Sequence, residues 1–266
     1  GEGLSLAREG RSGAERALEV LRKYAPAKKG MLSPRPELTA EQLLNAEQGE
    51  AAQRAGAINE LDRRMTAIHA DIAKKQTEIQ TLAPWLELDI PLECGSTSVV
   101  GFHLGVLSLS IPFETVKNTL LEITDLLELT TISTDRERQY LLLACHASLE
   151  TELLDAMKQF GWSRVGLRNW TGTAAENTDR LEKEIAVLEQ ELAEIETKLS
   201  TMGGERRGIQ ILSDCYETRE DLETNRIRSL DTEQVFFIEG WISAEAWPAL
   251  EKALEAYPVA AEAEDP

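Results

Sequence analysis

Histidine is the residue type that most often binds metals or moves protons near neutral pH, and this chain has three. His69, His103 and His146 lie in unrelated segments. A metal site or an acid–base pair needs side chains that converge, and nothing in this spacing indicates that they do. We therefore expect each histidine to have a structural role.

The three cysteines also give no pattern typical of a site. Cys94, Cys145 and Cys215 are far apart and odd in number, so they predict neither a disulfide framework nor a zinc site, and they suit a reducing compartment. Cys145 and His146 are adjacent, but adjacent strand residues point to opposite faces and cannot form a nucleophilic pair. We expect Cys145 to be a small buried core residue.

No phosphate-binding motif is present. The sequence has no P-loop and no GxGxxG after a strand, which excludes an ATPase of the kind built from long helices around a nucleotide-binding head. The carboxylates of LEKEIAVLEQELAEIE recur with helical periodicity and indicate a solvated helix face. The sequence therefore predicts no catalytic, cofactor-binding or metal-binding residue.

The composition excludes further classes of function. The 266 residues have a formal charge of -19, which argues against non-specific binding to nucleic acid or to anionic lipid. A basic protein partner fits better, although solvated helix faces alone also produce such a balance. No run of about 18 apolar residues is present, so we expect no direct membrane span in this chain. Its start at Gly1 suggests a fragment of something longer, although tag removal would give the same start.

The elements that organise the chain are two long amphipathic helices. A capping box at Thr39 and Gln42 predicts the start of the first, and Pro84 its end. Its apolar residues follow heptad spacing, interrupted only by Lys75, which is typical of a seam buried against another helix. The predicted seam positions are Ile58, Leu61, Met65, Ile68, Ile72, Ile79 and Leu82.

The second long helix begins at a capping box formed by Thr173 and Glu176. Its predicted seam positions are Leu181, Ile185, Leu188, Leu192, Ile195 and Leu199, followed by Met202. Gly203 and Gly204 interrupt the pattern and predict either a bend or a register break. Each seam needs a mate, so we predict one antiparallel hairpin, with a parallel homodimer as the alternative.

The segment between the helices predicts a small α/β lobe. Strand patterns cover SVVGFHLGVLSL, LTTIS, RQYLLLACHA and WSRVGLRNW. One helix is expected with Pro112 at its first position, and another with Gly161 closing it. The resulting order is βαββαβ, an antiparallel sheet with two helices on one face.

Both ends of the chain predict parts of a second lobe. Residues 14–24 form an amphipathic pattern, followed by a linker rich in proline and lysine. After the second long helix we expect a strand over Val235–Ile242, a helix from Ser243 to near Tyr257, and a short strand in the tail. This is a βαβ half-unit that nothing else in the chain completes.

The sequence therefore predicts an α+β fold: a long antiparallel helical hairpin that carries a βαββαβ distal lobe and a partial α/β proximal lobe. Residues 1–38 form the helix and linker of the proximal lobe, and 39–85 the first long helix. The distal lobe is 86–172, the second long helix 173–232, and the half-unit 233–266.

The segment VFFIEGWISAEAWPALEKALEAYP resembles a strand–Gly-Trp–helix signature of the V-type rotary ATPase and ATP synthase subunit called a or I. Glu239, Gly240 and Trp241 stand at the centre of that motif. KYAPAKKGMLSPRPELT looks like the linker of subunit I, and LAPWLELDIPL like its coiled-coil exit. The order of these segments over the whole chain makes the resemblance specific.

The resemblance implies a stator role. In that family the cytoplasmic part of the subunit has two lobes joined by a helical hairpin, and the lobes receive the peripheral stalks. We therefore expect a non-catalytic part at the cytoplasmic face of the membrane, the soluble portion of a membrane-anchored subunit in proton or sodium transport. Its expected partners are the peripheral-stalk subunits and the membrane sector, with no nucleic acid, no small-molecule substrate and no cofactor.

The chain departs from the family pattern at both ends. It lacks the first βα unit and every membrane helix, so no residue of ion translocation carries over. The missing strands predict an open sheet edge near Phe236–Trp241 and a proximal end that is poorly ordered or self-associating. The alternative to the stator is a coiled-coil scaffold or tether unrelated to rotary motors. Such a scaffold would not require the Gly-Trp unit.

Overall fold

The computed structural model describes residues 2–27, 39, 49–167, 169–228, 230–231, 236–237 and 239–264. These residues divide into two compact units. One unit is the continuous stretch 60–203, and the other combines 1–59 with 204–266. Residues 40–48, where the first long helix was expected to start, include Gln42 of its predicted capping box and lie outside the described residues, as does most of the linker. Thr39 is described and is not in a helix.

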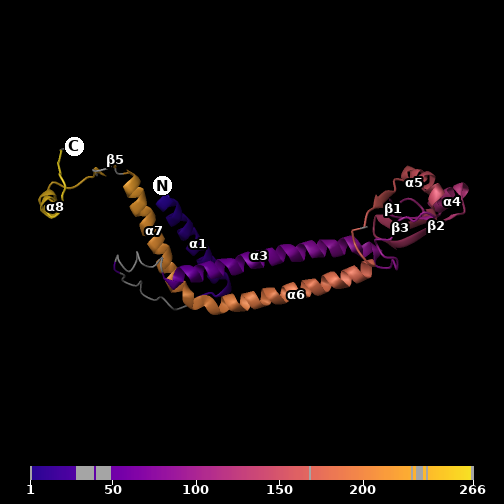
Figure 1. The fold of residues 1–266 in the computed structure, drawn as a ribbon, viewed down its shortest axis with the longest axis horizontal. Helices are drawn as coiled ribbons and strands as arrows, with labels where there is room; N and C mark the ends of the chain where they lie inside the picture. The colour runs from indigo at the N-terminus through magenta and orange to yellow at the C-terminus, as the bar shows by residue number, and fades with distance from the viewer. Residues whose placement is uncertain are drawn as a thin grey trace. The chain divides into compact units, whose positions relative to one another are not determined.

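Two helices of the continuous unit run side by side in opposite directions (Figure 1). They are α3 (Glu50–Leu82), of which residues 60–82 belong to this unit, and α6 (Ala174–Thr201). Arg64 pairs with Glu191, and Lys75, further along α3, pairs with Glu184, nearer the start of α6. The descending partner numbers establish the antiparallel direction, so the hairpin forms within one chain.

The sequence at the start of α6 caps the N-terminus of the helix. Thr173 Oγ1 accepts the backbone N–H of Glu176, and the Glu176 carboxylate accepts the N–H of Thr173. This capping box satisfies two of the four N–H groups that a helix leaves unpaired at its start. At the same end of the hairpin, a 3₁₀ turn over Ala83–Trp85, η2, follows α3 directly and packs near the start of α6.

A four-stranded sheet with two helices forms the distal lobe (Figure 1). Its elements are β1 (Val100–Ser108), α4 (Phe113–Ile123), β2 (Leu127–Thr134), β3 (Arg138–His146), the 3₁₀ turn η3 (Ala147–Leu149), α5 (Glu150–Gln159) and β4 (Ser163–Val165). The strand order is β2-β3-β1-β4, and every neighbouring pair is antiparallel. The prediction of an α+β fold is confirmed at this level.

The two faces of this sheet have different cores. On one face, α4 and α5 pack over the sheet, and the buried residues include Leu107, Val116, Leu141 and Met157. On the other face, Leu104, Tyr140 and Leu142 of the sheet pack against a cluster from the hairpin end. That cluster contains Leu82, Trp85, Leu88, Leu92, Leu167, Ala174 and Leu181. The sheet is therefore fixed both to its own helices and to the hairpin.

Local boundaries in the lobe differ from the prediction in two places. Pro112 is the N-cap residue of α4, with an extended backbone, rather than its first helical residue. The last strand is Ser163–Val165, much shorter than WSRVGLRNW, because Leu167 and Trp170 join the cluster at the hairpin end instead of continuing the sheet. Gly161 follows α5 with φ of 77°, and the bonds Gly161 N–Lys158 O and Trp162 N–Met157 O form a Schellman motif.

The discontinuous unit is built on α1 (Glu2–Tyr24), the first residues of α3, and α7 (Arg206–Arg228). A 3₁₀ turn over Met202–Glu205, η4, separates α6 from α7, so the two glycines interrupt the α-helix. α1 begins twelve residues before the expected position, at Glu2 instead of Ala14. Its glycines are used for close packing, because a Cβ on Gly10 would lie 2.4 Å from the Tyr216 ring.

Arg206 joins these helices at a defined point. Its guanidinium Nη2 donates to the carbonyl oxygens of Leu21, at 3.1 Å, and Ala25, at 2.5 Å. These carbonyls stand at the end of α1, where a helix has no partners of its own for them. Along the same pair of helices, Arg8 and Arg11 of α1 bind Glu220 of α7.

The C-terminal half-unit forms less regular structure than expected. The strands are β5 (Leu230–Asp231) and β6 (Phe236–Phe237), and the helix α8 is Trp247–Leu254. The strand predicted to Ile242 is wrong at its end, since residues 239–242 are not strand, and residues 258–264 form no strand either. A two-stranded pair is marginal without further strands. α8 buries none of its residues.

Candidate functional site

The hairpin seam is the feature that the sequence patterns single out most strongly, and the structure places its residues as follows. On α3, Ile58, Met65, Ile68 and Leu82 are buried, and Leu61, Ile72 and Ile79 are half-buried. On α6, Leu181, Ile195 and Leu199 are buried, and Ile185, Leu188 and Leu192 are half-buried. Residues of intermediate burial concentrate in the middle of the hairpin, which indicates a narrow two-helix contact there.

Lys75 interrupts this seam and is accommodated by an ion pair. Its side chain is three-quarters buried, and its ammonium group binds Glu184 on α6. The four-carbon stem of a lysine can cover apolar surface while its charged end reaches a carboxylate. The sequence showed Lys75 as a break in the pattern, whereas its partner, 109 residues away, carried no signal of its own.

Electrostatics reinforces the pairing of α3 with α6. Arg64 holds Glu191 with two hydrogen bonds, of 2.6 and 2.7 Å. The hydrogen bond from Arg64 lowers the pKa of the Glu191 carboxyl, and the hydrogen bond from Lys75 lowers the pKa of Glu184 in the same way. Both glutamates are therefore ionised at lower pH in the hairpin than in an unfolded chain.

His103 is the one histidine with a buried side chain in the described part of the molecule. It lies on the face of β1 that α4 and α5 cover, and its Nε2 is 3.0 Å from Oε1 of Glu150, the first residue of α5. Gly101 gives this pair its space, because a Cβ there would lie 3.1 Å from Nε2 of His103. The contact fastens the start of α5 to the sheet, a structural role.

Cys145 is buried in the core of the distal lobe, beneath the two helices. Burial, and then the charge of Glu150, raise the pKa of the Cys145 thiol, so it is less reactive than an exposed cysteine. His146 is exposed on the opposite side of the strand and binds Ser148 Oγ at 2.8 Å. The two side chains do not form a catalytic pair.

The remaining histidine and cysteines are dispersed. His69 Nδ1 contacts the Met65 carbonyl on its own helix, Cys94 is exposed, and Cys215 is buried. Among the described residues, no group of three or more His, Cys, Asp or Glu side chains could hold a metal ion. Within that same part of the chain, no helix is at once long and apolar enough to span a bilayer.

The residues of the Gly-Trp motif lie before α8 without regular secondary structure. Glu239, Gly240 and Trp241 are all exposed, and the Trp241 side chain is 90% exposed. Trp85 shows the opposite environment. It is buried where α3 ends, and its ring meets that of Tyr140 edge-on, with centroids 5.6 Å apart. Trp85 thus joins the hairpin to the sheet of the distal lobe.

These features together are a helical hairpin with a buried seam and ion pairs, which carries an α/β lobe. The sequence matches no protein-family model, and no curated protein sequence is significantly similar to it.

A search of solved structures finds a similar fold. The structure resembles the cytoplasmic N-terminal domain of subunit I, the homolog of subunit a, of a V-ATPase. The sequence identity is 15% and the TM-score 0.50, and the likeness covers 95% of this chain and 82% of that one. It extends over both units, so the fold is that of a V-ATPase subunit I domain at the level of its architecture.

Proposed function

We propose that this chain is a non-catalytic stator component of a V-type rotary ATPase, which couples peripheral stalks to the membrane sector that translocates protons or sodium ions. The structural likeness to the cytoplasmic domain of subunit I, over nearly the whole chain, is the observation that carries this proposal. The Gly-Trp segment and the order of the elements support it from the sequence.

The hairpin suits the mechanical task of a stator. A stator resists the torque of the rotor, so it must transmit force without bending. Two helices that share a buried seam deform less easily than one helix, because bending either one disturbs packing against the other. The cross-links Arg64–Glu191 and Lys75–Glu184 oppose sliding of α3 along α6.

No catalytic step is assigned to any residue. His103 and Glu150 hold secondary structure together, and Cys145 lies in a core. In this proposal the lobes bind the stalks and the hairpin sets the distance between the attachment points. The chain takes no cofactor or small substrate, and the ion pathway belongs to other parts of the motor.

Binding to purified peripheral-stalk heterodimers of the same organism tests the proposal directly. We expect the full chain, immobilised through its N-terminus, to retain the heterodimers at moderate ionic strength. A chain with Met65→Asp and Ile195→Asp, which breaks the seam, serves to show whether binding needs the folded hairpin. Failure of the unmodified chain to retain any stalk heterodimer would leave the coiled-coil scaffold as the better description.

A further inference from the structure

One end of the distal lobe carries an open basin of about 980 Å³. It lies where β1 finishes and β4 begins. Three segments line it: Val106–Ser110, Arg136–Arg138, and Gly161 with Ser163. Small-molecule sites bury most of the surface of their ligand, which an open depression between turns does not do.

The basin lies at the cationic end of the lobe. Residues 100–165 contain five lysines and arginines, and all stand on or near the elements that start or finish at this end. They are Lys117, Arg136, Arg138, Lys158 and Arg164. The opposite end, where α4 finishes and α5 begins, has acidic residues without any lysine or arginine: Glu122, Asp125, Glu128, Glu150 and Glu152. Four carboxylates lie at the cationic end too: Glu114, Asp135, Glu137 and Asp155. Five cations against four carboxylates leave that end with a net charge of +1, in a chain of charge -19.

The carboxylates near the basin are partly engaged within the lobe. Asp135 accepts the backbone N–H groups of Glu137 and Arg138 and the hydroxyl of Tyr140. Asp155 is 2.7 Å from the ammonium of Lys158, on the same helix. Arg136 is exposed at the tip of the β2–β3 turn, and Glu137 is the only acidic side chain of the lining.

Apolar and backbone features complete the basin. The Leu109 side chain is 45% exposed in its lining. β4 pairs with β1 only over Leu104–Val106, so Leu107 and Ser108 extend past the start of β4 and border the basin. The space around Gly161 is also open, since a Cβ there would meet nothing within 4 Å.

We propose that this basin docks an acidic amphipathic segment of a protein partner. Arg136 and Arg138 bind its carboxylates, Leu109 packs against an apolar side chain, and the end of β1 faces its backbone. Arginine suits this role because its planar guanidinium binds carboxylates in two-point contacts. The proposal rests on the proposed function in one respect: in a stator, the partner of this lobe is the peripheral stalk.

A pair of synthetic peptides tests whether the basin prefers an acidic segment, without any stalk protein present. One alternates glutamate and leucine, and the other has lysine in place of glutamate. Added to the ¹⁵N-labelled full chain, the acidic peptide is expected to shift backbone resonances of residues 106–110, 136–138 and 161–163. The lysine peptide is expected to leave these resonances unchanged.

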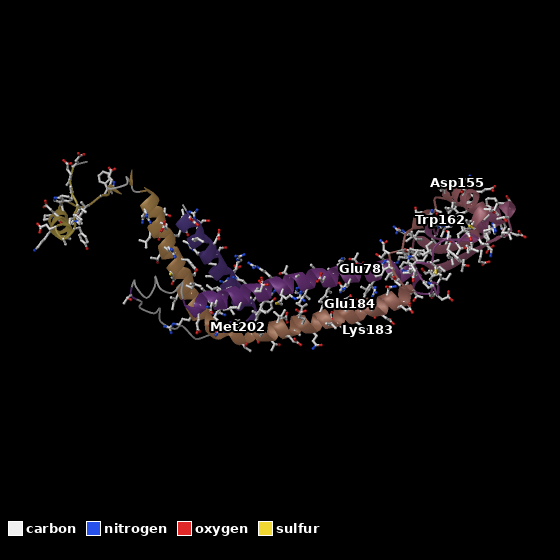
Figure 2. The ribbon with its side chains drawn as sticks, in the orientation of Figure 1. Glu78, Asp155, Trp162, Lys183, Glu184 and Met202 are labelled. Carbon is white, nitrogen blue, oxygen red and sulfur yellow. The ribbon has the colours of Figure 1, made fainter. Side chains whose placement is uncertain are left out.

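Charge-reversal variants identify the residues that bind the acidic peptide. We expect Arg136→Glu to weaken binding of the acidic peptide, and of the stalk heterodimer, by about tenfold. Leu109→Asp is expected to weaken both similarly. Lys183→Glu is the matched control: it makes the same change of net charge at an exposed position on α6 (Figure 2), and binding should not change.

The outcomes separate this inference from the proposed function. If the stalk does not bind but the acidic peptide does, the stator proposal fails and the basin remains an acidic-peptide site. If the stalk binds and Arg136→Glu behaves like Lys183→Glu, the inference is wrong while the stator proposal stands. Equal shifts from both peptides would also overturn it, because charge would then play no part.

Discussion

At the scale of single residues, close contacts in the distal lobe depend on glycines. Trp162 packs directly over Gly105 of β1, and Figure 2 shows this tryptophan among the elements of the lobe. A Cβ on Gly105 would lie 2.1 Å from the indole. Because the indole is bounded by backbone on one side and core residues on the other, it has little room to move.

We therefore expect Gly105→Ala to destabilise the protein by about 1–3 kcal/mol, as overpacking of a core does. Urea unfolding followed by circular dichroism measures it. Gly166→Ala, just after β4, is the matched control, because nothing lies within 4 Å of its Cβ position. Equal stability of the two variants would show that the indole moves aside at little cost.

Contacts between single residues far apart in the sequence could not be predicted from it. Heptad spacing identified residues such as Ile68 and Leu199, which are buried, because a helix surface repeats regularly along the chain. The contact of His103 with Glu150, and of Arg206 with the end of α1, joins residues with no common pattern. Such contacts depend on how distant elements meet, which local periodicity does not record.

At the scale of elements, the capping box of α6 was predictable because all its parts lie within four residues. We expect Thr173→Ala to cost about 1 kcal/mol, since it removes the acceptor for the Glu176 N–H. Thr197→Ala, in the exposed interior of the same helix, should not destabilise, because alanine is the better helix former. Thermal unfolding of the two variants side by side measures the difference.

The ion pairs of the hairpin make its stability depend on pH. Hydrogen bonds from Lys75 and Arg64 lower the pKa values of Glu184 and Glu191 in the folded chain. A carboxyl with a lowered folded pKa stabilises the fold above its unfolded pKa, about 4.3, and this contribution is lost as the pH falls below that value.

Melting temperature plotted against pH tests this. The combined variant Arg64→Gln and Lys75→Gln should lose less stability than the unmodified chain as the pH falls from neutral into the acid range. Lys183→Gln, for which the structure gives no ion pair, is the control. Parallel curves for all three proteins would mean that these pairs contribute nothing.

Elements also show where sequence prediction failed, and why. The glycines at positions 3, 10 and 13 argue against a helix, yet α1 includes all three. Packing against α7 outweighs their low propensity, since Gly10 accepts the Tyr216 ring at close range. In the C-terminal segment the error is the reverse. The apolar segment predicted a strand to Ile242, but residues 239–242, which the structure describes, are not strand.

At the scale of the whole molecule, the hairpin bears on oligomeric state. A parallel homodimer was the alternative way to cover the two seams. In the structure they cover each other within one chain, as the pairs Arg64–Glu191 and Lys75–Glu184 require. We therefore expect a monomer by sedimentation equilibrium at micromolar concentrations.

Association through the exposed residues around Trp241 is the competing possibility. Trp241→Ser distinguishes the two, because it would abolish association through that segment and leave a seam dimer intact. A dimer that survives this substitution and is disrupted by Ile72→Asp would contradict the intramolecular hairpin.

The division into two units has a consequence for how the chain is made. The unit of residues 60–203 is continuous, whereas the other is assembled from both ends of the chain. The bond between Arg8 and Glu220 spans 212 positions, and Arg206 reaches the end of α1 across more than 180. Contacts at such separation form late, after intervening segments have folded.

On the ribosome, α1 therefore emerges before α7 and waits for it. Its apolar residues, such as Val20 and Leu21, stay without α7 until residues 204–228 have been synthesised, while the hairpin and distal lobe can already fold. A released chain that ends at residue 203 should have a protease-resistant lobe and an α1 that is cut readily. During synthesis, α1 therefore depends on a chaperone until α7 emerges.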